Sequence, residues 1–213
     1  MVNREISEKS SVDEIRGRFD SDVERFSNLD TGQQATIDAP LAMELITHAA
    51  ISATPDAQNI LDIGCGAGNN TLKLLQLKNP LNVDLVDPSQ PMLSRAYARI
   101  SEENSGRIRT YQVDFRRVDL EPDSYDIIIA AALLHHLRDD QDWESAFRKI
   151  YDLTAPGGSI WITDLVSHDI PEVQSMMWKR YADYLENLGG IDYRKEVFGY
   201  IEKEDSPRSV TYQ

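Results

Sequence analysis

An acidic residue and three closely spaced glycines have the types and spacing that a nucleotide site needs. Asp62 stands two residues before Gly64 in the segment Asn59–Gly68, which reads Asn-Ile-Leu-Asp-Ile-Gly-Cys-Gly-Ala-Gly. Glycines let a backbone approach a ligand where a Cβ would collide, and a helix that follows them offers free N–H groups. A carboxylate here would repel a pyrophosphate and suit a ligand with positive charge, such as an α-ammonium or a sulfonium.

The glycine spacing separates two classes of nucleotide site. A dinucleotide-binding turn has the pattern G-x-G-x-x-G. Gly64 and Gly66 fit it, but the third glycine is Gly68, and Asn69 occupies the required position. The pattern Asp-x-Gly-x-Gly-x-Gly instead resembles motif I of class I S-adenosylmethionine (SAM)-dependent methyltransferases. A nicotinamide-dependent oxidoreductase is the alternative that this spacing disfavours.

A second acidic residue ends the next strand pattern. Asp87 follows the segment Leu81–Val86 and comes 19 residues after Gly68, close to the ~20 expected of a carboxylate that binds ribose hydroxyls. The alternative is a turn residue before Pro88. Ser89 then begins a helix as its N-cap. Met92 either lies near an adenine face, where a thioether packs well, or belongs to the core.

The resemblance to methyltransferases assigns further residues. It implies that Asp114 accepts from the adenine amine and that the backbone N–H of Phe115 meets a ring nitrogen, whereas the alternative is an aspartate that caps a turn. The small residues at 130–132, with Ala131 in the middle, would let the cofactor approach the end of their strand. Cys65 lies inside the glycine turn and is not expected to be a nucleophile. The predicted cofactor-binding set is Asp62, Gly64, Cys65, Gly66, Gly68, Asp87, Pro88, Met92, Asp114, Phe115 and Ala131.

No catalytic residue can be assigned from the sequence. His135 and His136 invite an acid–base role, but a Leu-His-His-Leu segment recurs in the resembled family with unlike substrates, which favours positioning or packing. Tyr181 is a further candidate base or acceptor contact. The acids Asp139, Asp140 and Asp142 stand before a predicted helix and are expected to serve its N-terminus. The sequence therefore predicts no metal site.

Five strand patterns alternating with helix patterns indicate a doubly wound α/β fold with a mainly parallel sheet. The strands are expected at 59–63, 81–87, 108–113, 125–132 and 159–164, with a turn at 155–158. The residues that the cofactor would contact all fall at the carboxyl ends of these strands, where such sheets bind ligands.

The chain is expected to be one domain in three parts. Residues 1–55 hold a frayed start at 1–10 and an amphipathic helix from Ser11 to Phe26 that either lies over the cofactor as a lid or packs on the sheet. A second amphipathic helix follows, with the apolar positions Leu41, Leu45, Ile46 and Ala49. Gln33 or Gln34 between them could touch the cofactor. Residues 56–164 are the cofactor-binding core, and 165–213 are helical.

The helical end departs from the resembled family, whose members finish with an antiparallel pair of strands. No such pair can be identified before Gln213, so the chain either is truncated or lacks the hairpin. Without that pair the edge of the sheet would be exposed, and a homodimer could cover it. The flanking helices look loosely like those of the carboxy-SAM synthase and tRNA-uridine modification group. In that group a basic residue of the helical region after the sheet holds the extra carboxylate of the modified cofactor, and Arg194 or Lys195 would have that role here.

Composition limits the partners. Among 213 residues, 22 Lys and Arg face 36 Asp and Glu, for a net charge of −14, which disfavours nucleic acid and anionic membranes. One cysteine, a polar start without a signal region and no membrane-spanning run favour a cytoplasmic protein. We expect a SAM-dependent methyltransferase that acts on a small molecule by direct displacement. A non-catalytic SAM-binding module is the remaining alternative.

Overall fold

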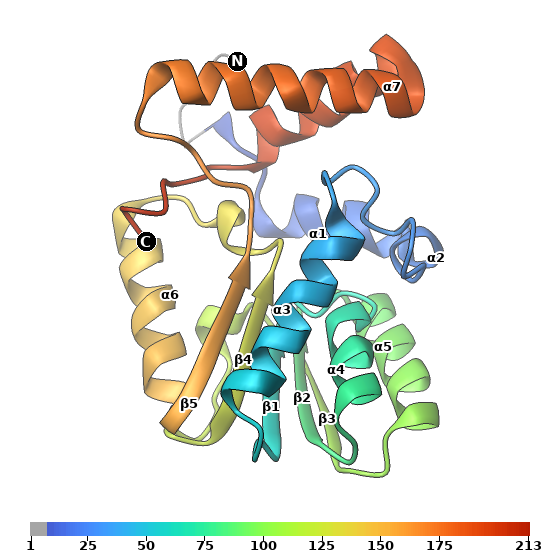
Figure 1. Cartoon of the computed structure of the whole chain (residues 1–213), viewed down its shortest axis with the longest axis vertical. Coiled ribbons are helices and arrows are strands. Elements are labelled where there is room, and N and C mark those ends of the chain that lie inside the picture. The colour runs from blue at the N-terminus through green and yellow to red at the C-terminus, as the bar shows by residue number, and fades with distance from the viewer. Residues whose placement is uncertain (1–7) are drawn as a thin grey trace.

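A computed structural model describes residues 8–213 and shows a five-stranded sheet between two layers of helices (Figure 1). Every pair of neighbouring strands is parallel, and the strand order is β3-β2-β1-β4-β5. The strands are β1 Asn59–Ile63, β2 Asn82–Asp87, β3 Ile108–Gln112, β4 Tyr125–Ala131 and β5 Thr154–Thr163. The predicted doubly wound fold is confirmed. Residues 8–213 contain no antiparallel strand pair, as expected for the missing hairpin.

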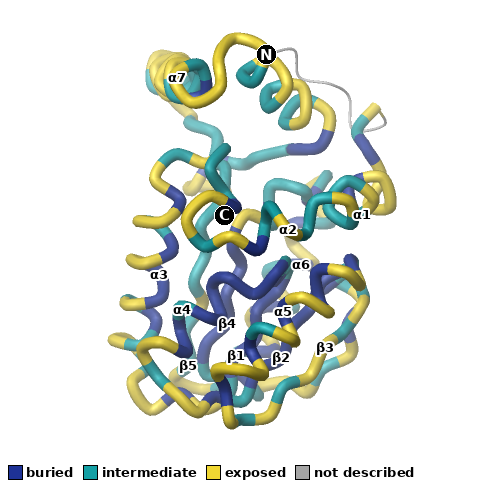
Figure 2. The backbone as a smooth tube through the Cα atoms, turned by 90° about the vertical axis from the view of Figure 1, so that its right-hand side faces the viewer, coloured by how far each residue is buried: buried dark blue, intermediate teal, exposed yellow. Residues whose placement is uncertain are grey.

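The sheet is buried because both faces are covered. Alternate residues of one strand point to opposite faces, so Ile127 and Ile129 of β4 pack in one apolar layer and Ile128 in the other. The helices α3 (Ala39–Ala53), α4 (Asn69–Leu77) and α5 (Gln90–Glu103) cover the first face, and α6 (Asp140–Leu153) covers the second. Figure 2 shows burial concentrated in the inner strands β1, β2 and β4, whereas the edge strands β3 and β5 are partly exposed.

The strand order reverses between β1 and β4, and this creates a crevice outside the carboxyl ends of the strands. The remaining helices lie at this end (Figure 1). They are α1 (Val12–Asp20), α2 (Val23–Phe26) and α7 (Pro171–Glu204), together with the short helices η2 (Phe115–Arg117) and η3 (Leu134–His136). Gly190 has non-helical angles inside α7 and divides it into the two helical stretches that the glycine pair predicted.

Several local predictions were wrong. The helix expected from Ser11 to Phe26 is interrupted between α1 and α2, where Ser21 caps the end of α1. Ile46 of α3 is buried and Ala49 is partly buried, as predicted. Leu41 and Leu45 are 52% and 60% exposed, because the face that α3 turns to the core carries Met43, Ile46 and Ala50.

Two further expectations were wrong at other places. The turn at 155–158 is absorbed into β5, where the register against β4 shifts between Tyr125 and Ile127. Residues 1–7 of the expected frayed start lie outside the described range, but Ser10 is buried and its N–H donates to the Lys203 carbonyl. No helix of the described residues is long and apolar enough to cross a membrane.

Candidate active site

A cavity of about 610 Å³ lies over the reversal point of the sheet, within the size range of ligand sites. Its floor comes from the strand ends: the glycine turn after β1, Asp87 and Pro88 after β2, Asp114 and Phe115 after β3, and Ala131 after β4. Its roof comes from α1, α2, the loop at 32–36 and the second half of α7.

The three glycines of the turn have different tasks, although all have positive φ angles of 51° to 80°. A Cβ on Gly66 would meet nothing within 4 Å, so this position opens toward the cavity. A Cβ on Gly64 would lie 2.8 Å from Leu133, and one on Gly68 would lie 3.1 Å from the Ala96 Cβ of α5. Among the described residues that line the cavity, Gly64 and Gly66 are present and Gly68 is missing. Gly68 therefore serves the packing of α4 on α5 rather than a ligand.

Asp62 does not face the ligand as the sequence suggested. It is missing from the described residues that line the cavity and is 1% exposed. Its Oδ2 accepts a hydrogen bond of 2.7 Å from the Thr71 hydroxyl of α4. Burial, with a smaller contribution from Asp87, raises the pKa of Asp62 to about 7. The side chain lies beneath the glycine turn, and any effect on a bound cation acts through that turn.

Asp87 lines the cavity and holds the glycine turn. Its Oδ2 accepts from the Gly66 N–H at 2.9 Å and its Oδ1 from the Ser89 N–H at 2.8 Å. Burial raises the pKa of Asp87 to about 6. Met92 and Pro88 lie beside it on the cavity wall, as predicted, and Met92 is fully buried. The Ser89 N-cap is confirmed, because its hydroxyl accepts from the Met92 N–H.

Asp114 and Phe115 line the cavity, but Asp114 is already paired. Its carboxylate accepts from the Arg116 guanidinium at 2.5 Å and from the Arg116 backbone N–H at 3.0 Å. Burial opposes ionisation of this carboxyl, but these hydrogen bonds outweigh it and lower its pKa. Arg116 also donates to Asp142 of α6 at 2.6 Å. An adenine amine would therefore have to share Asp114 with Arg116.

The acids at the start of α6 serve its N-terminus, as the sequence favoured: Asp139 is the N-cap, and Asp140 and Asp142 lie in the first turn. Asp139 accepts from the Asp142 N–H as the N-cap of α6, while Asp140 accepts from Arg208 and from the Tyr212 hydroxyl. None of the three is among the described residues that line the cavity.

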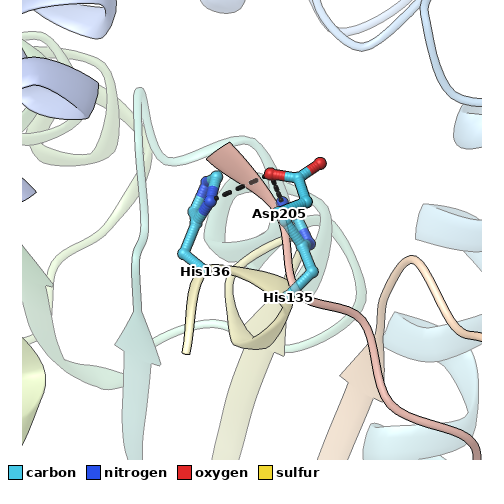
Figure 3. A group of neighbouring side chains, drawn as sticks. All are labelled: His135, His136 and Asp205. Atoms are coloured by element: carbon cyan, nitrogen blue, oxygen red, sulfur yellow. Dashed lines mark ion pairs between the residues drawn. The ribbon is translucent and has the colours of Figure 1, made fainter. Parts of the chain in front are cut away.

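His135 and His136 follow β4 and meet the carboxylates of Asp205, drawn in Figure 3, and of Asp164. His135 Nδ1 bonds Asp164, which follows β5, and its Nε2 lies 3.8 Å from Oδ1 of Asp205 at the end of α7. The Leu134 N–H also donates to Asp164, at 2.6 Å. The two imidazole rings are 4.2 Å apart. Both histidines and Asp205 line the cavity, so the cluster forms part of its wall.

The pKa values of the two imidazoles are shifted in opposite directions. Burial alone would lower the pKa of His135, but Asp164 and Asp205 outweigh it and raise it to about 9. Burial and the charge of His135 lower the pKa of His136. At neutral pH the free protein therefore holds a charged and a neutral imidazole side by side.

The roof is tied down by polar contacts. The Tyr181 hydroxyl donates to the Ala35 carbonyl at 2.7 Å and the Tyr184 hydroxyl to the Gln34 carbonyl at 2.8 Å. Arg18 of α1 forms two parallel hydrogen bonds with the buried Glu204 of α7, the shorter at 2.5 Å. Gln33, Gln34 and Tyr181 line the cavity, and α1 lies over it, in agreement with the lid alternative.

Sequence reasoning missed the contribution of the chain end. Asp205, Tyr193 and Tyr200 line the cavity, although nothing in their local sequence marks them. Conversely, Arg194 and Lys195 are missing from its described lining. Arg194 pairs with Glu186 and Lys195 with Asp192. The carboxy-SAM alternative thereby loses the residues on which it depended.

Comparison with known proteins decides the class of the core. Residues 60–158 match the model of a family described as a methyltransferase domain. Residues 60–158 are a SAM-dependent methyltransferase domain of class I type. The family and the cofactor expected from motif I are thereby confirmed, and the nicotinamide alternative is not supported. The roles given above to single residues remain predictions.

The methyltransferase domain has relatives with different acceptors. The chain is 33% identical over 91 residues (40% of its length) to polyamine aminopropyltransferase of Lachnospira eligens and covers 32% of that protein. It is 24% identical over 172 residues (80% of its length) to malonyl-[acyl-carrier protein] O-methyltransferase of Paenibacillus sp. strain JDR-2 and covers 61% of that protein. The chain thus spans about a third to three fifths of these curated relatives.

A solved structure supports the fold. Burkholderia thailandensis 1,6-didemethyltoxoflavin-N1-methyltransferase, determined with 1,6-didemethyltoxoflavin and S-adenosylhomocysteine, has a TM-score of 0.58 and 20% identity. The match covers 75% of this chain and 67% of that one. This similarity supports the doubly wound fold but gives no information about the acceptor.

Proposed function

We propose that this chain transfers the methyl group of SAM to a small-molecule acceptor held under α1 and α7. The observation that carries the proposal is the cavity of about 610 Å³ between the strand ends and the helices that lie over them. Its floor contains Gly66, Asp87 and Met92, and its roof contains Gln33 and Tyr181. A floor of this kind fits a nucleoside with a cationic sulfur, because it combines an open glycine turn, a carboxylate and a polarizable apolar wall.

Particular residues would hold the cofactor. The Asp87 carboxylate would accept from ribose hydroxyls, since it already accepts from two N–H groups and has further lone pairs. Met92 and Phe115 would pack against the base, and the backbone of Gly64–Ala67 would follow the amino-acid end. When bound, the cofactor supplies an electrophilic methyl group on a sulfonium.

The protein's part in the transfer is positioning and exclusion of water. Direct displacement needs a nucleophile aligned with the reacting methyl group, and such alignment removes a large part of the barrier. Asp114 and Arg116 form a polar wall beside Phe115 that Asp142 anchors from outside the cavity lining, while the contacts of Tyr181 and Arg18 hold the roof together. A roof whose parts are tied to one another in this way favours an acceptor small enough to fit beneath it.

Calorimetry with SAM and with S-adenosylhomocysteine tests the proposal. The intact chain is expected to bind both, and Asp87→Ala and Gly66→Val are expected to lose binding. The control for Asp87→Ala is Asp126→Ala, because Asp126 also accepts from two backbone N–H groups but at the opposite end of the sheet. The control for Gly66→Val is Gly157→Val, which has a positive φ and open space outside the cavity.

Turnover distinguishes the remaining alternatives. Formation of S-adenosylhomocysteine with a panel of small O-, N-, C- and S-nucleophiles would support the proposal. Binding of SAM without turnover on any acceptor would favour a non-catalytic module. Calorimetry that detects neither ligand on the folded chain would refute the proposal, and a titration with NADH, followed by fluorescence, would then examine the dinucleotide alternative.

A further inference from the structure

We propose that His135, His136 and Asp205 bind one divalent transition-metal ion on the cavity wall. One ligand atom of each residue lies within 4.8 Å of the other two. Asp205 Oδ1 is 3.2 Å from His136 Nδ1 and 3.8 Å from His135 Nε2. A tetrahedral ion with ligands at 2.0–2.1 Å holds its donor atoms about 3.4 Å apart. The observed separations bracket this value.

The orientation of the imidazoles supports metal binding more than mutual hydrogen bonding. His136 Nδ1 is buried and has no partner with hydrogen-bond geometry, although Asp205 Oδ1 is close. Two donors to one ion direct their lone pairs at a common point rather than at each other. Figure 3 shows both imidazoles turned toward the same oxygen of Asp205.

Asp164 supplies the outer contact that metal-binding histidines usually have. A ligating imidazole commonly donates its second N–H to a carboxylate, which fixes its tautomer and orientation. His135 Nδ1 bonds Asp164 in this way, so its Nε2 is left as the donor that faces Asp205. The backbone N–H groups of Leu134 and Leu165 hold Asp164 at 2.6 and 2.7 Å.

The third ligand is brought to the site by the end of α7. The Ser206 N–H donates to the His135 carbonyl at 2.6 Å, so the residue after Asp205 is fixed directly to the histidine segment. Arg138 donates to the Glu204 carbonyl at 2.5 Å and to the Ser10 carbonyl at 2.7 Å. On the α7 side these contacts involve the backbone of the two residues that flank Asp205. They would hold Asp205 in place without using its carboxylate.

The charges around the cluster favour a cation. The carboxylates of Asp164 and Asp205 face neutral or singly charged imidazoles, and a third carboxylate, Glu204, lies nearby. Arg18 forms its ion pair with Glu204, and Arg138 uses its guanidinium on backbone carbonyls. Two nitrogens and one oxygen suit Zn²⁺, Co²⁺ or Fe²⁺, and three protein ligands leave positions open to the cavity.

This inference deepens the proposed function, and it rests on that function only for the role of the ion toward the acceptor. An ion with an open position toward the cavity would bind an oxygen of the acceptor and lower the pKa of that group, which generates a better nucleophile. The acceptor class would then be one with a hydroxyl or carboxylate oxygen beside the reacting atom. The metal site itself requires no methyl transfer.

Metal content and cobalt spectroscopy of the full chain test the site. After loading with Co²⁺ and removal of excess ion, the protein is expected to hold one ion per chain and to show the intense visible bands of a low-symmetry site. His136→Gln and Asp205→Asn are expected to lose at least 100-fold in affinity. Asp164→Asn is expected to lose about 10–100-fold, as outer-contact variants do.

The matched control is the double variant His48→Gln/His168→Gln, which removes the other two histidines of the chain and is expected to bind Co²⁺ unchanged. Circular dichroism establishes that each variant is folded. Retention of the ion by folded His136→Gln, or binding below one ion per chain in the intact protein, would overturn the inference. Calorimetry with SAM on the chelator-treated protein separates the two proposals, because the cofactor pocket of Asp87 is expected to bind SAM without the ion.

Discussion

Replacement of Asp62 by asparagine is expected to stabilise the free protein at alkaline pH. The folded state raises the pKa of Asp62 from 3.8 to about 7, chiefly through burial. Between these two values the folded chain binds more protons at this site than the unfolded chain, so the free energy of unfolding falls as pH rises. Asparagine keeps an oxygen that can accept from the Thr71 hydroxyl and has no charge to bury.

The size of the effect follows from the shift. About three pKa units at 1.36 kcal/mol each correspond to about 4 kcal/mol once the carboxyl is fully ionised. Between pH 5 and pH 8 the linkage relation gives about 2–3 kcal/mol of this cost, because part of it has already accrued at pH 5. The gain in unfolding free energy for Asp62→Asn should therefore be about 2–3 kcal/mol larger at pH 8 than at pH 5.

Urea unfolding at the two pH values measures this difference. The control is Asp56→Asn, an exposed site, for which the gain should not change with pH by more than about 0.5 kcal/mol. If Asp62→Asn were equally or more destabilising at pH 8 than at pH 5, the electrostatic reasoning about this residue would be wrong. Calorimetry near pH 6.5 extends the test. A cationic cofactor should lower the pKa of Asp62 and release protons on binding, and the release should diminish in the variant.

Three other substitutions have separable effects. Asp84→Ala should destabilise the fold by about 3–5 kcal/mol, measured by urea unfolding, because it leaves Arg107, Arg109 and the buried Tyr125 hydroxyl without their shared carboxylate. An unchanged free energy of unfolding would show that the contacts of Asp84 with these three residues do not stabilise the fold. Gly68→Ala should raise the unfolding rate and cost about 1–3 kcal/mol through its left-handed backbone and its approach to Ala96. Its SAM affinity should stay within a few-fold, and a larger loss would restore Gly68 to the binding set. Tyr181→Phe removes the hydrogen bond to the Ala35 carbonyl and should make the closed position of the roof less stable by about 1 kcal/mol. The expected result is a several-fold faster release of S-adenosylhomocysteine with little change in Tm. An unaltered release rate would show that this contact does not hold the roof.

The sheet and the floor of the cavity were predictable because they depend on local patterns. Each strand is a short apolar run followed by a turn, and the carboxyl ends of parallel strands meet at one edge. The positions of Asp87, Met92 and Asp114 on that edge follow from this rule alone. The partner of Asp114 does not, because Arg116 folds back on it through a short helix that the sequence does not mark.

Asp62 shows how a correct element can still mislead. The strand was placed correctly, but the direction of the side chain was not considered. In a strand covered on both faces, residues two apart share a face. Asp62 therefore points to the same side as Ile60, which packs in the layer of α3, α4 and α5, and Thr71 of α4 meets it there. The same alternation directs Leu61 and Ile63 to the layer of α6.

The histidine cluster could not have been resolved from the sequence because its members come from three distant segments. His135 and His136 follow β4, Asp164 follows β5, and Asp205 arrives only after α7 reverses near Gly190. The glycine pair predicts a break in the helix but not where the second half leads. The sequence therefore favoured positioning or packing over an acid–base role for the Leu-His-His-Leu segment, without the carboxylate of Asp205 in view. The added carboxylate changes the question, because two imidazoles that share one oxygen can bind either protons or a metal ion. His136 Nδ1 lies 3.2 Å from Asp205 Oδ1 without hydrogen-bond geometry, which favours the ion.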